Sequence, residues 1–349
     1  MSHWRLDWPT SGGERLAYAQ LKVSPADFFV DEVLDLTGEL TAPEPTEVRG
    51  RGEHLCVRLE KVGDNTEFVA RELARLTHCR NFDVGFCGLK DRHAVTRQWF
   101  SLYRPGREAE DADLLQGISS RWPVVSAFRD ARKLRRGDHR GNRFVITLRK
   151  VSGDRQAIEN ALQRLAAAGA PNYFGPQRFG RDGANLDRAL HTDPSALNRR
   201  RRSGGKGRGG KKRAGSGGAK NVLYFSAARS WLFNEVLAAR VQDGSWAEAS
   251  ATGPLWGDGD TTATGPLEAR ERGIVSQTPG LADLFSVTRM KPERRPLAAR
   301  PEDLVWHWPG DDCLELAFLL SPGQYATAIL NDIFELEDMS LGRHNEQQG

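Results

Sequence analysis

Apolar residues in this chain change repeatedly between the two-residue spacing of a strand and the three-to-four-residue spacing of a helix. Leu55, Val57 and Leu59 alternate as they would in a strand. Asp64 and Glu67 then have the spacing of a helix N-terminal capping box. Apolar residues follow at helical spacing: Phe68, Val69, Leu73 and Leu76. This part of the chain therefore predicts strands and helices in one domain.

The same alternation returns near the C-terminus, whereas the middle of the chain has a different pattern of residues. Further strand patterns cover Val84 and Phe86, residues 99–102, Phe144 to Leu148, and Leu314 to Leu320, the last stopped by Pro322-Gly323. Further helical patterns cover Ala326 to Ile333 and Phe233 to Val241, the second with Gly244 as a C-terminal cap. We find no internal repeat. The pattern predicts an α+β domain built from both ends of the chain, with an insertion between them.

Composition restricts the class of protein. The chain has 349 residues, which suggests about two domains. Mean hydropathy is −0.55, and no stretch approaches the roughly 18 apolar residues of a membrane span. The first residues contain no apolar signal segment. The four cysteines form no CxxC pair and the histidines are scattered, so we expect no disulfide framework, no metal site and a reducing, cytoplasmic setting.

Positive charge is concentrated in one segment. Residues 199–220 contain ten Lys and Arg and no acidic residue, and taking these ten from the total of 50 leaves 40 basic against 46 acidic residues. Overall charge is therefore weak evidence for nucleic-acid binding. The segment contains glycine and basic residues with nothing to pack, which predicts a disordered loop. It is either a tolerated surface insertion or a tether that adds salt-dependent affinity for an RNA backbone.

Three segments concentrate glycine and polar residues between apolar runs, as functional loops on a rigid scaffold do. The first, residues 85–98, has Asp91 between Lys90 and Arg92. Nearby cations keep a carboxylate ionised, and an ionised aspartate can act as a nucleophile or a base. A neutralised aspartate in a surface turn explains the same local residues, and His93 is as readily a surface histidine.

The other two segments suit RNA but also have ordinary structural explanations. Residues 137–144 combine arginine, glycine and Asn142, which can contact phosphate and a base edge. A basic hairpin turn explains them equally well. Residues 169–185 interleave aromatic residues with Arg, Asn and Gln, which can stack on bases and grip phosphate. A glycine-rich turn with buried aromatic residues is the alternative. No Walker A motif, dinucleotide fingerprint or nucleophile elbow accompanies the three segments.

Taken together and in this order, the segments closely resemble the TruD family of tRNA pseudouridine synthases. The resemblance runs from about Lys22 to the C-terminal helix, and several motifs in one order are more specific than any one of them. It rests on the runs KVSPADFFV from Lys22, GEH from Gly52, NT from Asn65, GLKDRHAVTRQ from Gly88, GNRF from Gly141, PNYFGPQRFG from Pro171 and SAARS from Ser226.

This resemblance implies a fold and an activity. The fold is an α+β pseudouridine synthase domain, formed here by residues 1–168 and 300–349, with an inserted TRUD domain at 169–299 that contains the basic loop at 199–220. The activity is isomerisation of uridine to pseudouridine in tRNA, at position 13 of tRNA(Glu) for bacterial members. No cofactor and no metal are implied, and no obligate protein partner or membrane association is evident.

The resemblance also assigns roles to single residues. Asp91 falls on the catalytic aspartate of the family, and Phe28 and Asn142 fall on positions that contact the target nucleotide. Tyr325 falls where relatives often have phenylalanine, and tyrosine can stack on a base in the same way. Lys22 is a candidate for pairing with the carboxylate or with the base. Because adjacent side chains of a strand-like loop point apart, at least one of Lys90 and Arg92 is expected to contact RNA phosphate instead.

Two other classes of function fit parts of the sequence. A non-catalytic RNA-binding protein or RNA chaperone would use the basic and aromatic segments equally well, but it gives no reason for the Lys-Asp-Arg loop beside them. A glycosidase with a carboxylate nucleophile normally needs a second acid near the first, and the loop of Asp91 contains none.

Overall fold

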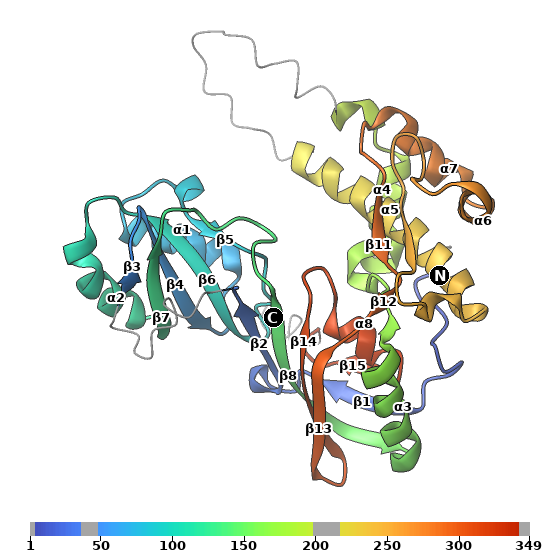
Figure 1. Cartoon of the computed structure of the whole chain (residues 1–349), viewed down its shortest axis with the longest axis horizontal. Helices are drawn as coiled ribbons and strands as arrows, with labels where there is room; N and C mark the ends of the chain where they lie inside the picture. Colours follow the sequence, from blue (N-terminus) through green and yellow to red (C-terminus); the bar gives the residue numbers. More distant parts are fainter. Residues whose placement is uncertain (1–3, 36–47, 198–216, 342–349) are drawn as a thin grey trace, which may run out of the picture. The chain divides into compact units, whose positions relative to one another are not determined.

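Figure 1 shows a computed structural model of the chain, which describes residues 4–35, 48–197 and 217–341. The chain divides into two compact units, which we call the sheet unit and the helix unit. The sheet unit consists of Ala17–Arg155, Pro301–Gln324 and Glu335–Gly349. The helix unit consists of Met1–Leu16, Gln156–Arg300 and Tyr325–Phe334. The mixture of strands and helices confirms the predicted α+β class.

The sheet unit is built on one eleven-stranded sheet. The strands are β1 (Ala17–Leu21), β2 (Phe28–Val33), β3 (Arg49–Gly50), β4 (His54–Lys61), β5 (Gly85–Phe86), β6 (Val95–Tyr103), β7 (Val124–Asp130), β8 (Gly141–Gly153), β13 (Glu302–Gly310), β14 (Cys313–Leu320) and β15 (Phe334–Asp338). The main path of the sheet runs β13-β14-β8-β2-β6-β4-β7-β3, while β1 pairs with β8 and β15, and β5 pairs with β6.

Two helices of the sheet unit, α1 (Thr66–Leu76) and α2 (Asp111–Ser119), cover one face of its strands (Figure 1). The alternating residues of β4 are fully buried in this core together with Val69, Leu73, Phe100, Leu115 and Ile118. Burial of this apolar surface is the main stabilising contribution to the unit. The helix cap differs from the prediction: Asn65 accepts the hydrogen bond of the Phe68 N–H at 2.8 Å, so the capping residue is Asn65 and not Asp64.

The core of the helix unit is built on the long helix α5 (Gly217–Gln242). Its other helices are α3 (Arg155–Ala168), whose first residue belongs to the sheet unit, α4 (Ala184–Leu190), α6 (Gly265–Val275), α7 (Pro279–Ala282) and α8 (Ala326–Leu330). Two small antiparallel pairs complete it: β10 (Thr252–Leu255) with β11 (Glu293–Pro296), and β9 (Ala170–Pro171) with β12 (Ala298–Ala299). Short 3-10 helices occur at Pro25–Asp27, Asn81–Asp83, Glu108–Glu110, Pro176–Phe179, Arg181–Gly183, Pro194–Leu197, Ser245–Ala247 and Asp283–Val287.

The compact units draw their boundaries differently from the predicted domains. The first sixteen residues group with the helix unit because their tryptophans pack there. Trp8 stacks on Tyr173 with ring centroids 5.8 Å apart and donates a hydrogen bond of 2.7 Å to Glu235 on α5. Trp4 donates one of 2.8 Å to Asp187 on α4. The domain boundaries at 168 and 300 stay a prediction.

The predicted basic loop lies largely outside the described residues. Its last four residues are helical, because α5 begins at Gly217. Isolated helical turns are marginal, and the packed apolar run from Phe225 onward is what extends this helix toward its start. Within the described ranges no helix has both the length and the apolar character needed to cross a membrane.

Candidate active site

The loop that carries Asp91 joins β5 to β6 and is fastened by buried polar side chains. Gln98 on β6 donates a hydrogen bond of 2.6 Å to the carbonyl of Gly88. Thr66, at the start of α1, accepts one of 3.0 Å from the N–H of Lys90 and donates one of 2.9 Å to Gln98. Thr66 and Gln98 are both buried. Since leaving such groups unpaired is costly, these bonds fix the loop on the sheet.

Asp91 is an ionised carboxylate that is partly open to solvent. Its Oδ2 lies 2.6 Å from Nζ of Lys22, and its Oδ1 accepts a hydrogen bond of 2.9 Å from the N–H of His93. Burial by itself would raise the pKa of Asp91, but the bonds from Lys22 and His93 outweigh it and hold the pKa below its ordinary value. The side chain is 34% exposed, so a substrate can reach the anion.

Lys22 joins three parts of the site through one buried ammonium group. Its Nζ lies 3.3 Å from Oδ2 of Asp338 on β15 and 4.9 Å from the centroid of the Phe28 ring, in addition to its contact with Asp91. The backbone of Lys22 has φ of 57°, a left-handed conformation that is uncommon for lysine. These contacts offset the cost of that conformation, as is typical of functional sites.

Lys90 differs from the expectation drawn from its position next to Asp91. Its Nζ forms an ion pair with Glu32 on β2, and both side chains are almost fully buried. Glu32 also accepts a hydrogen bond of 3.2 Å from the N–H of Trp99. Lys90 is therefore occupied inside the protein, and the cation that keeps Asp91 ionised is Lys22. The predicted phosphate contact, if made in this loop, falls to Arg92.

A third lysine belongs to the same charged region. Lys61, the last residue of β4, is 2% exposed and donates a hydrogen bond of 2.8 Å to the carbonyl of Asp64. Burial, helped by the charge of Lys90, lowers the pKa of Lys61 to about 8. The charges of Asp91 and Glu32 act in the opposite direction.

Glu32, Lys61 and Asp338 were not predicted from the sequence, although the sequence contains a signal for each. Glu32 is in phase with Phe28 and Val30 on β2, and Lys61 continues the inward-facing positions of β4. Asp338 has the same phase as the buried Phe334 on β15. Because alternate residues of a strand face the same side, charged residues at these positions indicate buried ion pairs or buried hydrogen bonds.

Asn142 presents an unoccupied hydrogen-bond acceptor at the start of β8. Its Nδ2 lies 3.3 Å from Nε2 of His139, whereas its Oδ1 is buried and makes no hydrogen bond with any described residue. Gly141 beside it allows close approach of β14, since a Cβ there would lie 2.6 Å from the carbonyl oxygen of Leu320. Asn142 is opposite Glu32, the partner of Lys90, in the pairing of β8 with β2. A free amide oxygen can accept an N–H from a base edge.

Phe28 and Tyr325 occupy different surroundings. Phe28 is only 6% exposed, and its ring packs edge-on against Phe144 with centroids 6.0 Å apart. Lys22 and Phe28 thus form one wall near Asp91, with little ring surface open to a base. Tyr325 is 42% exposed and belongs to the helix unit, where its ring lies 6.2 Å from that of Phe174.

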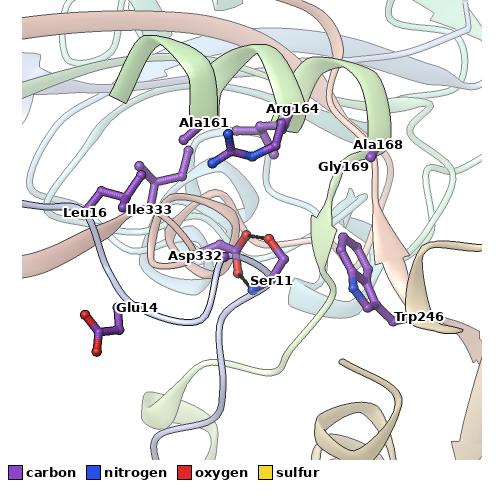
Figure 2. A pocket seen from close by; sticks show the side chains of 12 residues that line it. Ser11, Glu14, Leu16, Ala161, Arg164, Ala168, Gly169, Trp246, Asp332 and Ile333 are labelled. Carbon is purple, nitrogen blue, oxygen red and sulfur yellow. Dashed lines mark hydrogen bonds between the residues drawn. The ribbon is translucent and has the colours of Figure 1, made fainter. Parts of the chain in front are cut away.

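A pocket in the helix unit contains none of the predicted site residues (Figure 2). Asp332 points into it and accepts hydrogen bonds from the backbone N–H of Ser11, at 2.7 Å, and from its hydroxyl. Burial raises the pKa of Asp332. Arg164 and Trp246 also line the pocket. The groups best suited to catalysis, an ionised carboxylate and the lysine that pairs with it, lie instead at Asp91 and Lys22.

No group of three or more His, Cys, Asp or Glu in residues 4–35, 48–197 and 217–341 is arranged to hold a metal ion. The carboxylates near Asp91 are paired with lysines, as described above. Asp338, the nearest of them through Lys22, also accepts hydrogen bonds from the N–H and the hydroxyl of Ser340 at 3.0 and 2.6 Å. Its oxygens are therefore engaged by Lys22 and Ser340, whereas a glycosidase uses a second carboxyl group that is free to act on the substrate beside its nucleophile.

Comparison with known proteins identifies the family. A family model described as tRNA pseudouridine synthase D (TruD) matches residues 14–186. A tRNA pseudouridine synthase D of Marinobacter nauticus is 60% identical over 357 residues, covering 99% of each chain. The protein of the same name from Xanthomonas axonopodis pv. citri is 38% identical and covers 97% of this chain and 96% of its own length.

A solved structure supports the fold. The crystal structure of a protein from Methanosarcina mazei assigned to tRNA pseudouridine synthase D covers 93% of this chain and 95% of its own, with a TM-score of 0.62 and 19% identity. The structural likeness concerns the fold, whereas the sequence identities above establish the relationship. This chain therefore belongs to the tRNA pseudouridine synthase D (TruD) family.

Proposed function

We propose that this protein isomerises uridine 13 of tRNA(Glu) to pseudouridine, with Asp91 as the group that acts on the nucleotide. The observation that carries the proposal is the ion pair of Asp91 with the buried Lys22, 2.6 Å long, on a carboxylate that is still 34% exposed. This arrangement supplies a carboxylate that is anionic at neutral pH and can be reached by a substrate. Relatives named tRNA pseudouridine synthase D, 60% and 38% identical to this chain, support the reaction class.

The proposed reaction is an isomerisation that rearranges bonds within one nucleotide. The C1′–N1 bond of uridine breaks, the uracil turns, a C1′–C5 bond forms, C5 loses its proton and N1 gains one. Atoms and electrons balance without an oxidant, a reductant or an energy source. The uridine must first leave the helical stack, which costs roughly a few kcal/mol.

Asp91 supports three routes for the first step. As an anion it can attack C6 of the uracil, attack C1′ of the ribose, or remove the C2′ proton to give a glycal. All three require a deprotonated carboxylate, and the bonds from Lys22 and the His93 N–H provide that condition. The ammonium of Lys22 can in addition stabilise negative charge that develops on the nucleotide.

Asn142 is proposed to read the uracil edge. Its unoccupied Oδ1 matches the N3–H donor of uracil, whereas N3 of cytosine carries no hydrogen. Phe28 and Tyr325 are proposed to contact the flipped nucleotide. A base stacked on an exposed aromatic ring gains about 1–3 kcal/mol, and of these two rings that of Tyr325 has the larger open surface.

The test is incubation of the purified protein with unmodified tRNA(Glu), followed by carbodiimide treatment and mapping of reverse-transcription stops. The proposal expects one new stop that corresponds to position 13. An RNA-binding protein or chaperone without catalytic activity would bind the tRNA and leave no stop. Stops at another position would retain the reaction class and reject the proposed target.

A further inference from the structure

Two arginines of the helix unit lie against the ring of Phe174, and a third, Arg229, is near enough to Arg178 for their charges to interact. The guanidinium carbon of Arg295 is 4.2 Å from the centroid of the Phe174 ring, and that of Arg178 is 5.7 Å from it. Arg229 is on α5, next to Ser230, whose hydroxyl accepts a hydrogen bond of 3.3 Å from Arg178. These three arginines, which we call the arginine cluster, all belong to the same compact unit.

The arginine cluster has only neutral partners among the described residues. Arg229 donates to the carbonyls of Leu255 and Lys291 at 2.8 and 3.1 Å. Arg295 donates to the carbonyl and to the side-chain oxygen of Asn172, at 3.3 and 2.6 Å. Arg178 donates to the hydroxyls of Ser226 and Ser230. No carboxylate in the described ranges forms an ion pair with any of the three.

This lack of counter-charge differs from the treatment of other arginines in the same unit. Arg294, next in sequence to Arg295, pairs with the buried Glu271 at 2.6 Å. Arg272 pairs with both Asp260 and Glu268. Arg294 and Arg272 are therefore neutralised within the chain, whereas the three arginines of the cluster are not paired with any described carboxylate.

The uncompensated charges act on one another. Burial lowers the pKa of Arg295 to about 10, against an opposing effect of Tyr325, and the charge of Arg178 lowers the pKa of both Arg295 and Arg229. Glu293 acts favourably on Arg229 from a distance. Arg229 and Arg295 each also have a buried Nε–H without an acceptor. Burying like charges without a counter-ion is unfavourable, so an anion bound nearby would stabilise this region.

We propose that the arginine cluster is a phosphate-binding site for the RNA backbone, with the half-buried Arg178 as the residue that contacts the phosphate. The planar fork of a guanidinium matches two phosphate oxygens, and Arg229 and Arg295 supply additional positive field. The exposed ring of Tyr325, which packs on Phe174, lies beside the cluster and offers a stacking surface for a nucleotide. The choice of RNA as the source of the phosphate rests on the function proposed above.

The competing explanation is purely structural. Arg229 and Arg295 attach α5 and the β10–β11 pair to neighbouring backbone, and their removal would damage the fold in either case. Arg178 can distinguish the two explanations, because its partners are the hydroxyls of Ser226 and Ser230. If Arg178 is replaced, the Ser230 hydroxyl still donates its hydrogen bond of 2.8 Å to the carbonyl of Ser226. Its removal relieves repulsion and leaves no buried carboxylate unpaired.

The experiment compares Arg178→Gln with Arg272→Gln, a control that loses the same charge from an arginine whose carboxylate partners are in the chain. Affinity for unmodified tRNA(Glu) is measured over a range of salt concentrations. We expect Arg178→Gln to bind roughly tenfold more weakly at low salt, with the slope of log Kd against log salt reduced by about 1. Arg272→Gln is expected to stay within about twofold of the unaltered protein, because its charge is already neutralised. Arg178→Lys, which keeps the charge without the fork, is expected to lie between them.

A second measurement is independent of RNA. Inorganic phosphate is expected to raise the Tm of the unaltered protein and of Arg272→Gln, and to raise that of Arg178→Gln distinctly less. Without phosphate, Arg178→Gln is expected to be at least as stable as the unaltered protein. A less stable Arg178→Gln with an unchanged salt slope, or an equal response of all variants to phosphate, would overturn the site.

The two proposals fail in different ways. If the protein binds tRNA through Arg178 but forms no pseudouridine, the phosphate site is supported and the proposed function is wrong. If the protein modifies tRNA and Arg178→Gln has an unchanged slope of log Kd against log salt, the function is supported and the phosphate site is wrong. If the unaltered protein binds no tRNA, the phosphate measurement still decides whether the arginine cluster binds an anion.

Discussion

At the scale of single residues, the proposed chemistry depends on one ammonium group shared by two carboxylates. Lys22 holds Asp91 and Asp338 together across 69 and 316 residues of sequence, respectively. Neighbouring residues offered only Lys90 and Arg92 as partners of Asp91 and could not show this long-range ion pair, whereas the family resemblance had already made Lys22 a candidate. The motif located Asp91 and Asn142, whereas Glu32, Lys61 and Asp338 come from strands whose partners only the fold defines.

Replacement of Lys22 by methionine tests this arrangement. The pKa of Asp91 is now depressed, so its ionised form is lost only below its ordinary value of 3.8. Without Lys22, burial dominates and raises the pKa of Asp91. The acid limb of the pH profile, where kcat/KM falls as Asp91 becomes protonated, should therefore move to higher pH. Activity at pH 7 should also fall by about 10²-fold or more. The measurement is kcat/KM for tRNA(Glu) between pH 4.5 and 8.

A matched control is Lys150→Met, which changes an exposed lysine whose φ of 49° is also in the left-handed region. It should leave the acid limb where it is. An unchanged acid limb in Lys22→Met would mean that Lys22 does not set the ionisation of Asp91.

At the scale of elements, the sequence predicted the interiors of strands and helices better than their ends. The polar run before Trp99 was expected to be a loop, but β6 already begins at Val95, because it pairs with β2 from Phe29 onward. The two-residue strands β9 and β12 have no periodicity that a sequence could show, and they exist only because their backbones meet in the fold. The register of β2 between β6 and β8 is what brings the Asp91 loop next to Lys22 and Asn142.

The end of β4 gives a prediction about stability. Lys61 has a pKa lowered from 10.5 to about 8, so the folded state releases its proton more readily than the unfolded state. Between these two values the unfolded state binds more protons, and stability should therefore rise as the pH increases from 8 to 10.5. Lys61→Met removes the charged form, so it should be more stable than the unaltered protein at pH 7, by about 1–3 kcal/mol.

Urea unfolding of both proteins at pH 7, 9 and 10.5 measures this difference. The advantage of Lys61→Met should shrink as the pH rises, because the unaltered protein gains stability and the variant lacks that contribution. A variant that is less stable at pH 7, with the same difference at every pH, would show that Lys61 is charged and well compensated.

At the scale of the whole molecule, alternation of patterns predicted the α+β class, and the order of the motifs predicted the family. The grouping of residues into units was harder to predict, because Trp4 and Trp8 lie at the start of the chain but pack with α4 and α5. Whether an aromatic residue joins one core or another depends on long-range packing that local spacing does not encode. The basic segment at 199–213 is outside the described residues, so its role stays a prediction.

The segment can be tested through its charge. Replacing Arg199, Arg200, Arg201 and Arg202 by glutamine should weaken tRNA binding and lower the slope of log Kd against log salt by up to about 3–4, if each arginine meets one phosphate. The position of the modified uridine should not change, because phosphate contacts carry no sequence information. An altered position, by carbodiimide mapping, would show that the segment contributes to specificity.

The central claim is that the carboxylate of Asp91 performs the chemistry, and Asp91→Asn tests it most directly. Asparagine keeps the size of the side chain and an oxygen that can accept from the His93 N–H and from Lys22. Pseudouridine formation in tRNA(Glu) and the Kd for the same tRNA should be measured on one preparation. We predict that the variant forms no pseudouridine and that its Kd stays within a few-fold of the unaltered protein. Turnover retained by Asp91→Asn would contradict the account.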